Sequence, residues 1–175
     1  MRRISTVLAV TLLALAVPFV AMQLLGIQIN TSISAPLGFY IQDPAGPYVA
    51  FCPMDEYLSA GRHYRRSAPA WLSNGCPDGA EQLLKPVAAR EGDTVVLDSA
   101  GVIVNGRRIP RSAALDDDSE GRPMTRWPVG TYAVAPDQIW VISSYNAKSY
   151  DSRYFGPVPV ASVRARYRPL LVVSE

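Results

Sequence analysis

Lys85 is the residue whose surroundings point most directly to chemistry. The chain has 17 basic residues but only two lysines, and Lys85 lies within the apolar run Leu83–Ala89. An ammonium group there must either reach water along its own alkyl stem or lose solvation. Loss of solvation lowers a lysine pKa from about 10.4 toward neutrality. Lys85 is therefore either a snorkelling or ion-paired charge, or a base that can take a proton.

The other candidate bases have less favourable neighbours. The single histidine, His63, lies among three arginines with no apolar residues to orient it, which disfavours a Ser-His triad. Lys148 has polar neighbours and is predicted to be a solvated surface charge. A Ser-Lys pair requires a neutral lysine. Lowering the lysine pKa by about three units corresponds to roughly 4 kcal/mol of relative stabilisation of the neutral form. Burial of Lys85 can provide this difference.

Ser34 is the serine whose setting best suits a partner role. It stands two residues before Pro36 and four before Gly38, in a segment with little helical propensity. Proline restricts the backbone there, and glycine permits another chain segment to approach closely. Taken alone, Ser34 could equally be an ordinary exposed hydroxyl.

The composition limits the function classes. A chain of 175 residues with 15 prolines and 12 glycines is long enough for one turn-rich domain built mainly from strands. Its net charge of +2 is too small to indicate a nucleic-acid surface, so we expect no nucleic-acid partner. Asp116–Asp118 is predicted to be a solvated loop, and with one histidine we expect no metal site and no cofactor.

The N-terminus predicts the cellular location. Met1–Arg3 carries positive charge, and Ile4–Ile29 contains no charged residue and is long enough to cross a bilayer. We therefore predict a hydrophobic signal or anchor segment over 1–29 and a body over 30–175 outside the cytoplasm. The small residues of Ala14–Ala16 leave open whether the segment is kept as an anchor or removed.

The two cysteines fit an oxidising compartment. Cys52 and Cys76 bracket a polar segment, and a disulfide between them would close an excursion over 52–76 at its base. The loop-entropy model gives such a bridge roughly 3 kcal/mol. Two reduced core thiols are the alternative. The spacing is too wide for a CxxC redox centre.

Short apolar runs bounded by turn residues predict an antiparallel, strand-based body. The Asn105-Gly106 pair predicts a type I′ hairpin within it. The predicted strands are Tyr48–Phe51, Leu83–Ala89, Thr94–Leu97, Gly101–Val104, Arg107–Ile109, Thr131–Val134, Gln138–Ile142 and Val163–Val173.

Three segments resemble, in the same order, the motifs of the TraF-type conjugal transfer peptidases, a branch of the type I signal peptidase family. Ser34–Tyr40 matches the nucleophile box S-x-P-x-G-x-Y. Leu84–Asp93 resembles the lysine box K-x-V-x-A-x-x-G-D, and Asp151–Val158 resembles the box D-S-R-x-F-G-x-V. The resemblance implies a signal-peptidase-like antiparallel β-sheet domain that follows an N-terminal membrane-spanning or signal helix.

The resemblance also implies roles for individual residues. Ser34 would be the nucleophile and Lys85 the general base. Asp151 would be a supporting residue, either catalytic or structural through a salt bridge to Arg153. Direct contact between Asp151 and Lys85 is not expected, because an ionised carboxylate would raise the lysine pKa. Ser32 would either contribute its hydroxyl to an oxyanion hole or be a plain loop serine.

The function implied is a serine endopeptidase at the periplasmic face of the bacterial inner membrane. Its substrate would be an exported, membrane-embedded precursor, the conjugative pilin, and attack by the substrate's own amine could give a cyclic product. A general leader peptidase is the nearest alternative, although such enzymes usually carry methionine where this chain has Ala35 and one more residue before the proline. A non-enzymatic scaffold for pilus assembly or the cell envelope is the other alternative.

Overall fold

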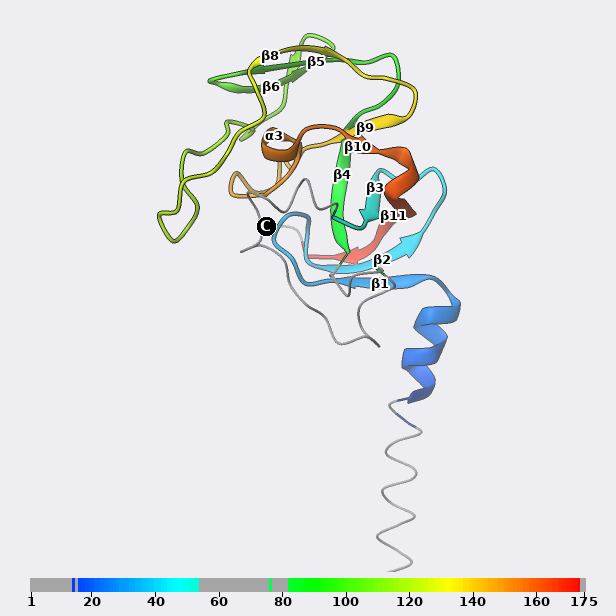
Figure 1. Ribbon diagram of the computed structural model, residues 1–175. Helices are drawn as coiled ribbons and strands as arrows, with labels where there is room; N and C mark the ends of the chain where they lie inside the picture. Colours follow the sequence, from blue (N-terminus) through cyan, green and yellow to red (C-terminus); the bar gives the residue numbers. More distant parts are fainter. Residues whose placement is uncertain (1–13, 15, 54–75, 77–81, 174–175) are drawn as a thin grey trace, which may run out of the picture.

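The computed structural model describes residues 14, 16–53, 76 and 82–173. Residues 16–24 form a helix that leads into the first strand (Figure 1). Within the described residues, no helix is long and apolar enough to cross a membrane. Residues 1–13 of the predicted hydrophobic segment lie outside the described residues, as does the stretch containing His63.

The larger of two antiparallel sheets contains seven strands. In spatial order they are β1 (Ile27–Asn30), β2 (Gly38–Gln42), β11 (Val163–Val172), β3 (Tyr48–Phe51), β4 (Leu83–Ala89), β9 (Gln138–Val141) and β10 (Val158–Pro159).

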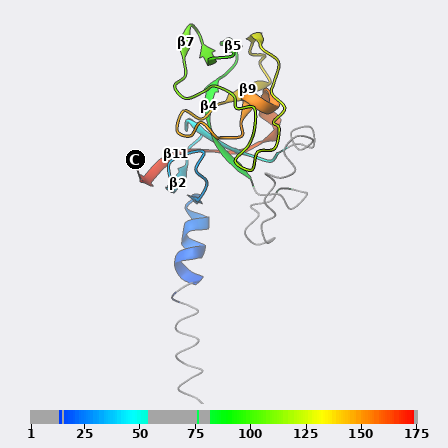
Figure 2. The same ribbon diagram turned by 90° about the vertical axis from the view of Figure 1, so that its left-hand side faces the viewer.

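The smaller sheet contains four strands, and a loop, a short helix and a 3₁₀ turn complete the body. The smaller sheet lies at the end of the molecule away from the N-terminal helix (Figures 1 and 2). Its order is β7 (Arg107–Arg108), β6 (Gly101–Val104), β5 (Thr94–Asp98) and β8 (Gly130–Ala133); the helix is α3 (Ser152–Phe155) and the 3₁₀ turn is η2 (Val160–Ser162).

The mainly β, antiparallel fold predicted from the sequence is confirmed. β3, β4 and β6 have the predicted bounds, and the other predicted strands agree to within one or two residues. The Asn105-Gly106 hairpin is confirmed by positive φ angles at both residues, 49° and 80°. The Asp116–Asp118 run lies in the loop between β7 and β8, where Asp116 pairs with Arg126 and Asp118 with Arg122.

β1 and β2 were not predicted as strands. β1 begins at Ile27, inside the predicted 1–29 segment, so the sheet starts before the apolar run ends. Gly38 opens β2 with φ +139°, and a Cβ atom there would come 2.2 Å from the carbonyl oxygen of Leu171. The chain segment that the glycine allows to approach is therefore β11.

Cys52 follows β3 directly and forms a disulfide with Cys76, 24 residues later. The predicted disulfide is therefore present, and the alternative of two reduced thiols is wrong. The bond connects the end of a central strand to the far side of the excursion. Residues 54–75 of that excursion lie outside the described residues.

Two core clusters position the segments that carry the candidate site. The first cluster contains Ala35 and Leu84, together with Tyr40, Ala50 and Tyr167. A second cluster on β3, β9 and α3 includes Val49 and Phe155. Ser34 and Lys85 thus each adjoin a residue of the first cluster, although they lie 51 positions apart in the sequence.

Candidate active site

Lys85 lies in the middle of β4, in register with Val49 of β3. Side chains alternate along a strand, so Lys85 points to the same side as Leu83 and Val87, which pack against the second cluster. The residue is only 4% exposed. The lysine side chain therefore lies inside the fold and does not snorkel to water.

Ser34 lies in the loop that connects β1 to β2, and side chains at both ends of the loop hold it. The amide Nδ2 of Asn30, the last residue of β1, donates to the carbonyl oxygens of Ser32, Ala35 and Pro36 at 2.9, 3.1 and 3.0 Å. The Tyr40 hydroxyl donates to the Pro36 oxygen at 2.8 Å. Ala35 is fully buried in the core. The Ser34 backbone is therefore flanked by fixed peptide groups.

The structure brings Ser34 and Lys85 into direct contact. Lys85 Nζ lies 2.6 Å from Ser34 Oγ and 2.9 Å from Ser149 Oγ. A charged lysine donates to both hydroxyl oxygens, whereas the lone pair of a neutral lysine can accept the Ser34 proton. The geometry thus fits a nucleophile and its base, oriented by a third group.

The electrostatic surroundings lower the pKa of Lys85 to about 8. Burial is the largest cause, because it disfavours the charged form. The negative charge of Asp151 opposes this shift and the positive charge of Arg153 adds to it. A lysine with this pKa is partly neutral at mildly alkaline pH and can act as a base there.

Asp151 forms a buried ion pair with Arg153, with 2.8 Å between its Oδ1 and Arg153 Nε. Its Oδ2 accepts from Arg153 Nη2 at 2.9 Å and from the backbone N–H of Ser143 at 3.0 Å. Among the described residues no hydrogen bond joins Asp151 to Lys85, although the charge of Asp151 still acts on the lysine and raises its pKa. The pair also caps α3, because Asp151 accepts from the Arg153 N–H.

Arg153 holds the segment that follows β9. Its guanidinium donates to the carbonyl oxygens of Ala113, Ala147 and Ser149 at 3.0, 3.1 and 2.8 Å. The carbonyl oxygen of Ser149 therefore accepts from Arg153, and its hydroxyl oxygen accepts from Lys85. The Asp151–Arg153 pair thus positions the hydroxyl group that orients the lysine.

Ser149 and Ser143 were not identified from the sequence. Ser149 stands two residues before Asp151. In an extended segment this spacing places two side chains on the same side, so the position of Asp151 could have marked Ser149 as a candidate site residue. Ser143 Oγ donates to the carbonyl oxygen of Ser34 at 2.7 Å, and no local pattern indicates that contact. Lys148 is exposed, as predicted.

Ser32 is half-buried beside the candidate nucleophile. Its N–H donates to Asn30 Oδ1 at 3.1 Å, and its carbonyl oxygen accepts from Asn30 Nδ2. These contacts place its backbone in the same turn as Ser34. A role for its hydroxyl in an oxyanion hole stays a prediction.

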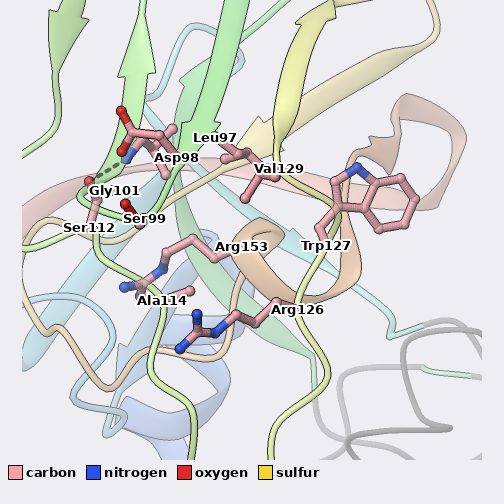
Figure 3. A pocket seen from close by; sticks show the side chains of 11 residues that line it. Leu97, Asp98, Ser99, Gly101, Ser112, Ala114, Arg126, Trp127, Val129 and Arg153 are labelled. Carbon is pink, nitrogen blue, oxygen red and sulfur yellow. Dashed lines mark hydrogen bonds between the residues drawn. The ribbon is translucent and has the colours of Figure 1, made fainter.

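A pocket of about 90 Å³ lies between the smaller sheet and the loop before β8 (Figure 3). Leu97, Trp127, Val129 and Arg153 are among the residues that line it. Ser34 and Lys85 do not line it, so this pocket is not where a substrate would meet Ser34.

Replacing Ser149 with alanine is expected to lower kcat about tenfold to a hundredfold. The hydrogen bond that orients the lysine is lost, and bonds to charged groups contribute about 1.5–3 kcal/mol. Steady-state kinetics of the precursor cleavage that the sequence motifs imply measures the effect. Lys148→Ala, at the exposed neighbouring position, is the control and should leave kcat unchanged. Equal rates for Ser149→Ala and the wild type would remove this role.

The chain is similar to proteins of one family. A family model described as signal peptidase, peptidase S26, matches residues 45–171. The plasmid transfer protein TraF of Escherichia coli is 34% identical over 156 residues, covering 86% of each chain. The conjugal transfer protein TraF of Agrobacterium tumefaciens (strain 15955) is 34% identical over 152 residues, covering 83% of this chain and 82% of that one.

Among solved structures, a signal peptidase I from Enterococcus faecalis V583 matches 77% of this chain and 99% of that chain. The identity is 20% and the TM-score is 0.35. The range of the family model contains Lys85, Ser149 and Asp151, whereas Ser34 lies before its first residue.

Proposed function

Because the chain belongs to the signal peptidase family S26, we propose that it is a serine endopeptidase with Ser34 as nucleophile and Lys85 as general base. The contact of 2.6 Å between Ser34 Oγ and Lys85 Nζ carries the proposal. The burial that lowers the pKa of Lys85 to about 8 supports it, because the base must be neutral to act.

The reaction begins when the neutral Lys85 amine takes the Ser34 hydroxyl proton as Oγ attacks the scissile carbonyl carbon. The negative charge on the carbonyl oxygen is stabilised by the Ser34 N–H and, in this proposal, by the Ser32 hydroxyl. The C–N bond then breaks, and Lys85 returns the proton to the leaving amine. This leaves an ester between Ser34 and the part of the substrate that precedes the cleaved bond.

The second half of the reaction releases the product. Lys85 deprotonates a water molecule, which attacks the ester and restores the Ser34 hydroxyl. An amine at the substrate's own N-terminus can replace this water, in which case an amide closes a cyclic product and no water is consumed. Both outcomes use the same acyl-enzyme.

We propose the conjugative pilin precursor as the substrate. The relatives from Escherichia coli and Agrobacterium tumefaciens are named as plasmid or conjugal transfer proteins, which supports a role in conjugation. Full-length protein would be incubated with vesicle-embedded pilin precursor and, separately, with an unrelated leader-bearing precursor, and the products measured by intact mass spectrometry. Cleavage of the pilin alone is expected; equal cleavage of both would favour a general leader peptidase. No cleavage of either would overturn the proposal.

The pH dependence should report the ionisation of Lys85. Below its pKa of about 8 the lysine is mostly charged, so kcat/KM should fall about tenfold per pH unit and level off above that pKa. The unfolded chain binds this proton more tightly, with a pKa of about 10.4, so stability should rise with pH between about 8 and 10.4. A kcat/KM profile that stays flat between about pH 6 and 9 would contradict a lysine base.

An apolar surface beside Ser34 supports a location at a membrane. Ile29 of β1, Phe39 of β2 and Leu171 of β11 lie in register across three neighbouring strands, and Ile29 and Leu171 are 51% and 68% exposed. Ile33, next to Ser34, is 61% exposed. The helix over 16–24 enters the sheet at the same strand, β1. We propose that the bilayer covers this surface, so that Ser34 meets its substrate at the periplasmic face of the inner membrane.

The double variant Ile29→Asp, Leu171→Asp tests the membrane surface. Each apolar side chain contributes about 1.5–3 kcal/mol when buried, so cleavage of vesicle-embedded precursor should fall tenfold or more. Cleavage of the same precursor in detergent should stay unchanged. Val129→Asp, at an exposed apolar residue beside the smaller sheet, is the matched control. A double variant as active on vesicles as the control would show that the surface does not contact lipid.

A further inference from the structure

Ser143 is a fully buried residue between β9 and α3, and its hydroxyl and backbone N–H both have hydrogen-bond partners. Its Oγ donates to the Ser34 carbonyl oxygen at 2.7 Å and accepts from the N–H groups of Tyr145 and Asn146, each at 3.2 Å. Its own N–H donates to Asp151 Oδ2 at 3.0 Å. A hydroxyl has one proton and two acceptor positions, so the Ser143 side chain is saturated and fixed in one orientation.

The contact from Ser143 differs in origin from the others that hold the Ser34 loop. Asn30 and Tyr40 belong to β1 and β2, the same hairpin as the loop, so they fix its shape but not its position relative to Lys85. In the larger sheet, β2 and β4 are separated by β11 and β3. The Ser34–Lys85 distance therefore depends on how two distant parts of a curled sheet are held together.

Ser143 connects these two parts of the sheet through its hydrogen bond to the Ser34 carbonyl oxygen. It follows β9, which pairs with β4, and its segment continues to Ser149, whose hydroxyl contacts Lys85. We propose that Ser143 is a positioning residue that holds the Ser34 backbone against the segment carrying Ser149. Through it, the nucleophile has a fixed distance to its base. This role rests on the proposed function of Ser34 as nucleophile.

The isosteric variants Ser143→Thr and Ser143→Val separate the hydroxyl from the volume of the side chain. Both add the same bulk to a buried position, but only threonine can donate to the Ser34 carbonyl. A misplacement of about 1 Å lowers rates about a hundredfold, so kcat for the valine variant should be about a hundredfold below that for threonine. KM should agree within about twofold, because the substrate-binding surface is unchanged.

The experiment measures kcat and KM of both full-length variants on the pilin precursor and determines both structures. In the valine variant Ser34 Oγ should lie beyond hydrogen-bond distance of Lys85 Nζ, and in the threonine variant within it. Ser144→Ala, at the exposed neighbouring position, is the control, and Ser143→Ala, which adds no bulk, replaces the valine variant if that does not fold. The inference is overturned if the two variants have equal kcat values or if the contact survives in valine.

Failure of the proposed function would look different. If Ser34→Ala processed the precursor as well as the wild type does, Ser34 would not be the nucleophile. The distance between Ser34 and Lys85 in the two Ser143 variants would still decide whether the Ser143 hydroxyl positions the loop.

Discussion

Replacing Ser34 with alanine, or Lys85 with methionine, is expected to reduce precursor processing by about 10³-fold or more. The first variant removes the attacking oxygen and the second the group that accepts its proton. Nucleophile and base act as a unit, so the double variant should be no slower than either single one. Cleavage followed by intact mass spectrometry measures all three.

The control for lysine replacement is Lys148→Met, which removes the other lysine of the chain at an exposed position. It should process the precursor at the wild-type rate. Circular dichroism of Ser34→Ala should match the wild type, because the contacts of Asn30 and Tyr40 that hold the loop do not involve the Ser34 hydroxyl. Urea unfolding should show a loss no larger than about 1.5–3 kcal/mol, the contribution of a hydrogen bond to a charged group. Normal processing by either Ser34→Ala or Lys85→Met would exclude the dyad.

Replacing Arg153 with methionine is expected to destabilise the fold by about 3–5 kcal/mol, because Asp151 keeps a buried charge without its partner. The double variant Asp151→Asn, Arg153→Met should recover part of that loss, since it buries no lone charge. Urea unfolding measures both. Arg108→Met, which breaks the half-exposed pair with Asp98, is the control and should change stability far less.

The same Arg153 substitution has a predictable effect on Lys85. The charge of Arg153 lowers the lysine pKa and that of Asp151 raises it, so Arg153→Met should move the pKa of Lys85 upward. The pH at which kcat/KM levels off should therefore rise above about 8. If stability and the pH profile both stay at wild-type values, the ion pair has neither the structural nor the electrostatic role assigned here.

Local sequence signals were sufficient to predict the strands and turns that are marked by their own residues and direct neighbours. β4 is a short apolar run between turn residues, and Asn105-Gly106 needs positive φ angles that few residue pairs adopt easily. β1 was missed because its isoleucines, Ile27 and Ile29, continue an apolar segment that has the length of a membrane span. The alternation that marks a strand is hidden there.

The candidate site was only partly predictable for a related reason. The anomaly of Lys85 is local, since a charge within an apolar run is visible from its neighbours in the sequence, but those neighbours left open whether the side chain reaches water. Its contact with Ser34 depends on the curl of a seven-stranded sheet, which no local pattern encodes, and it was anticipated through family motifs. Ser143 and Ser149 are ordinary polar residues in sequence, and only the tertiary contacts distinguish them.

The most direct measurement of the central claim is to trap the acyl-enzyme. Full-length protein and pilin precursor would be mixed at a pH above 8, quenched in acid within the first turnover and examined by mass spectrometry after digestion. The account predicts an ester on the Ser34 peptide that carries the part of the precursor preceding the cleaved bond, and no such adduct in Ser34→Ala. Turnover of the precursor by Ser34→Ala at the wild-type rate, or an acyl group found on a different residue, would contradict it.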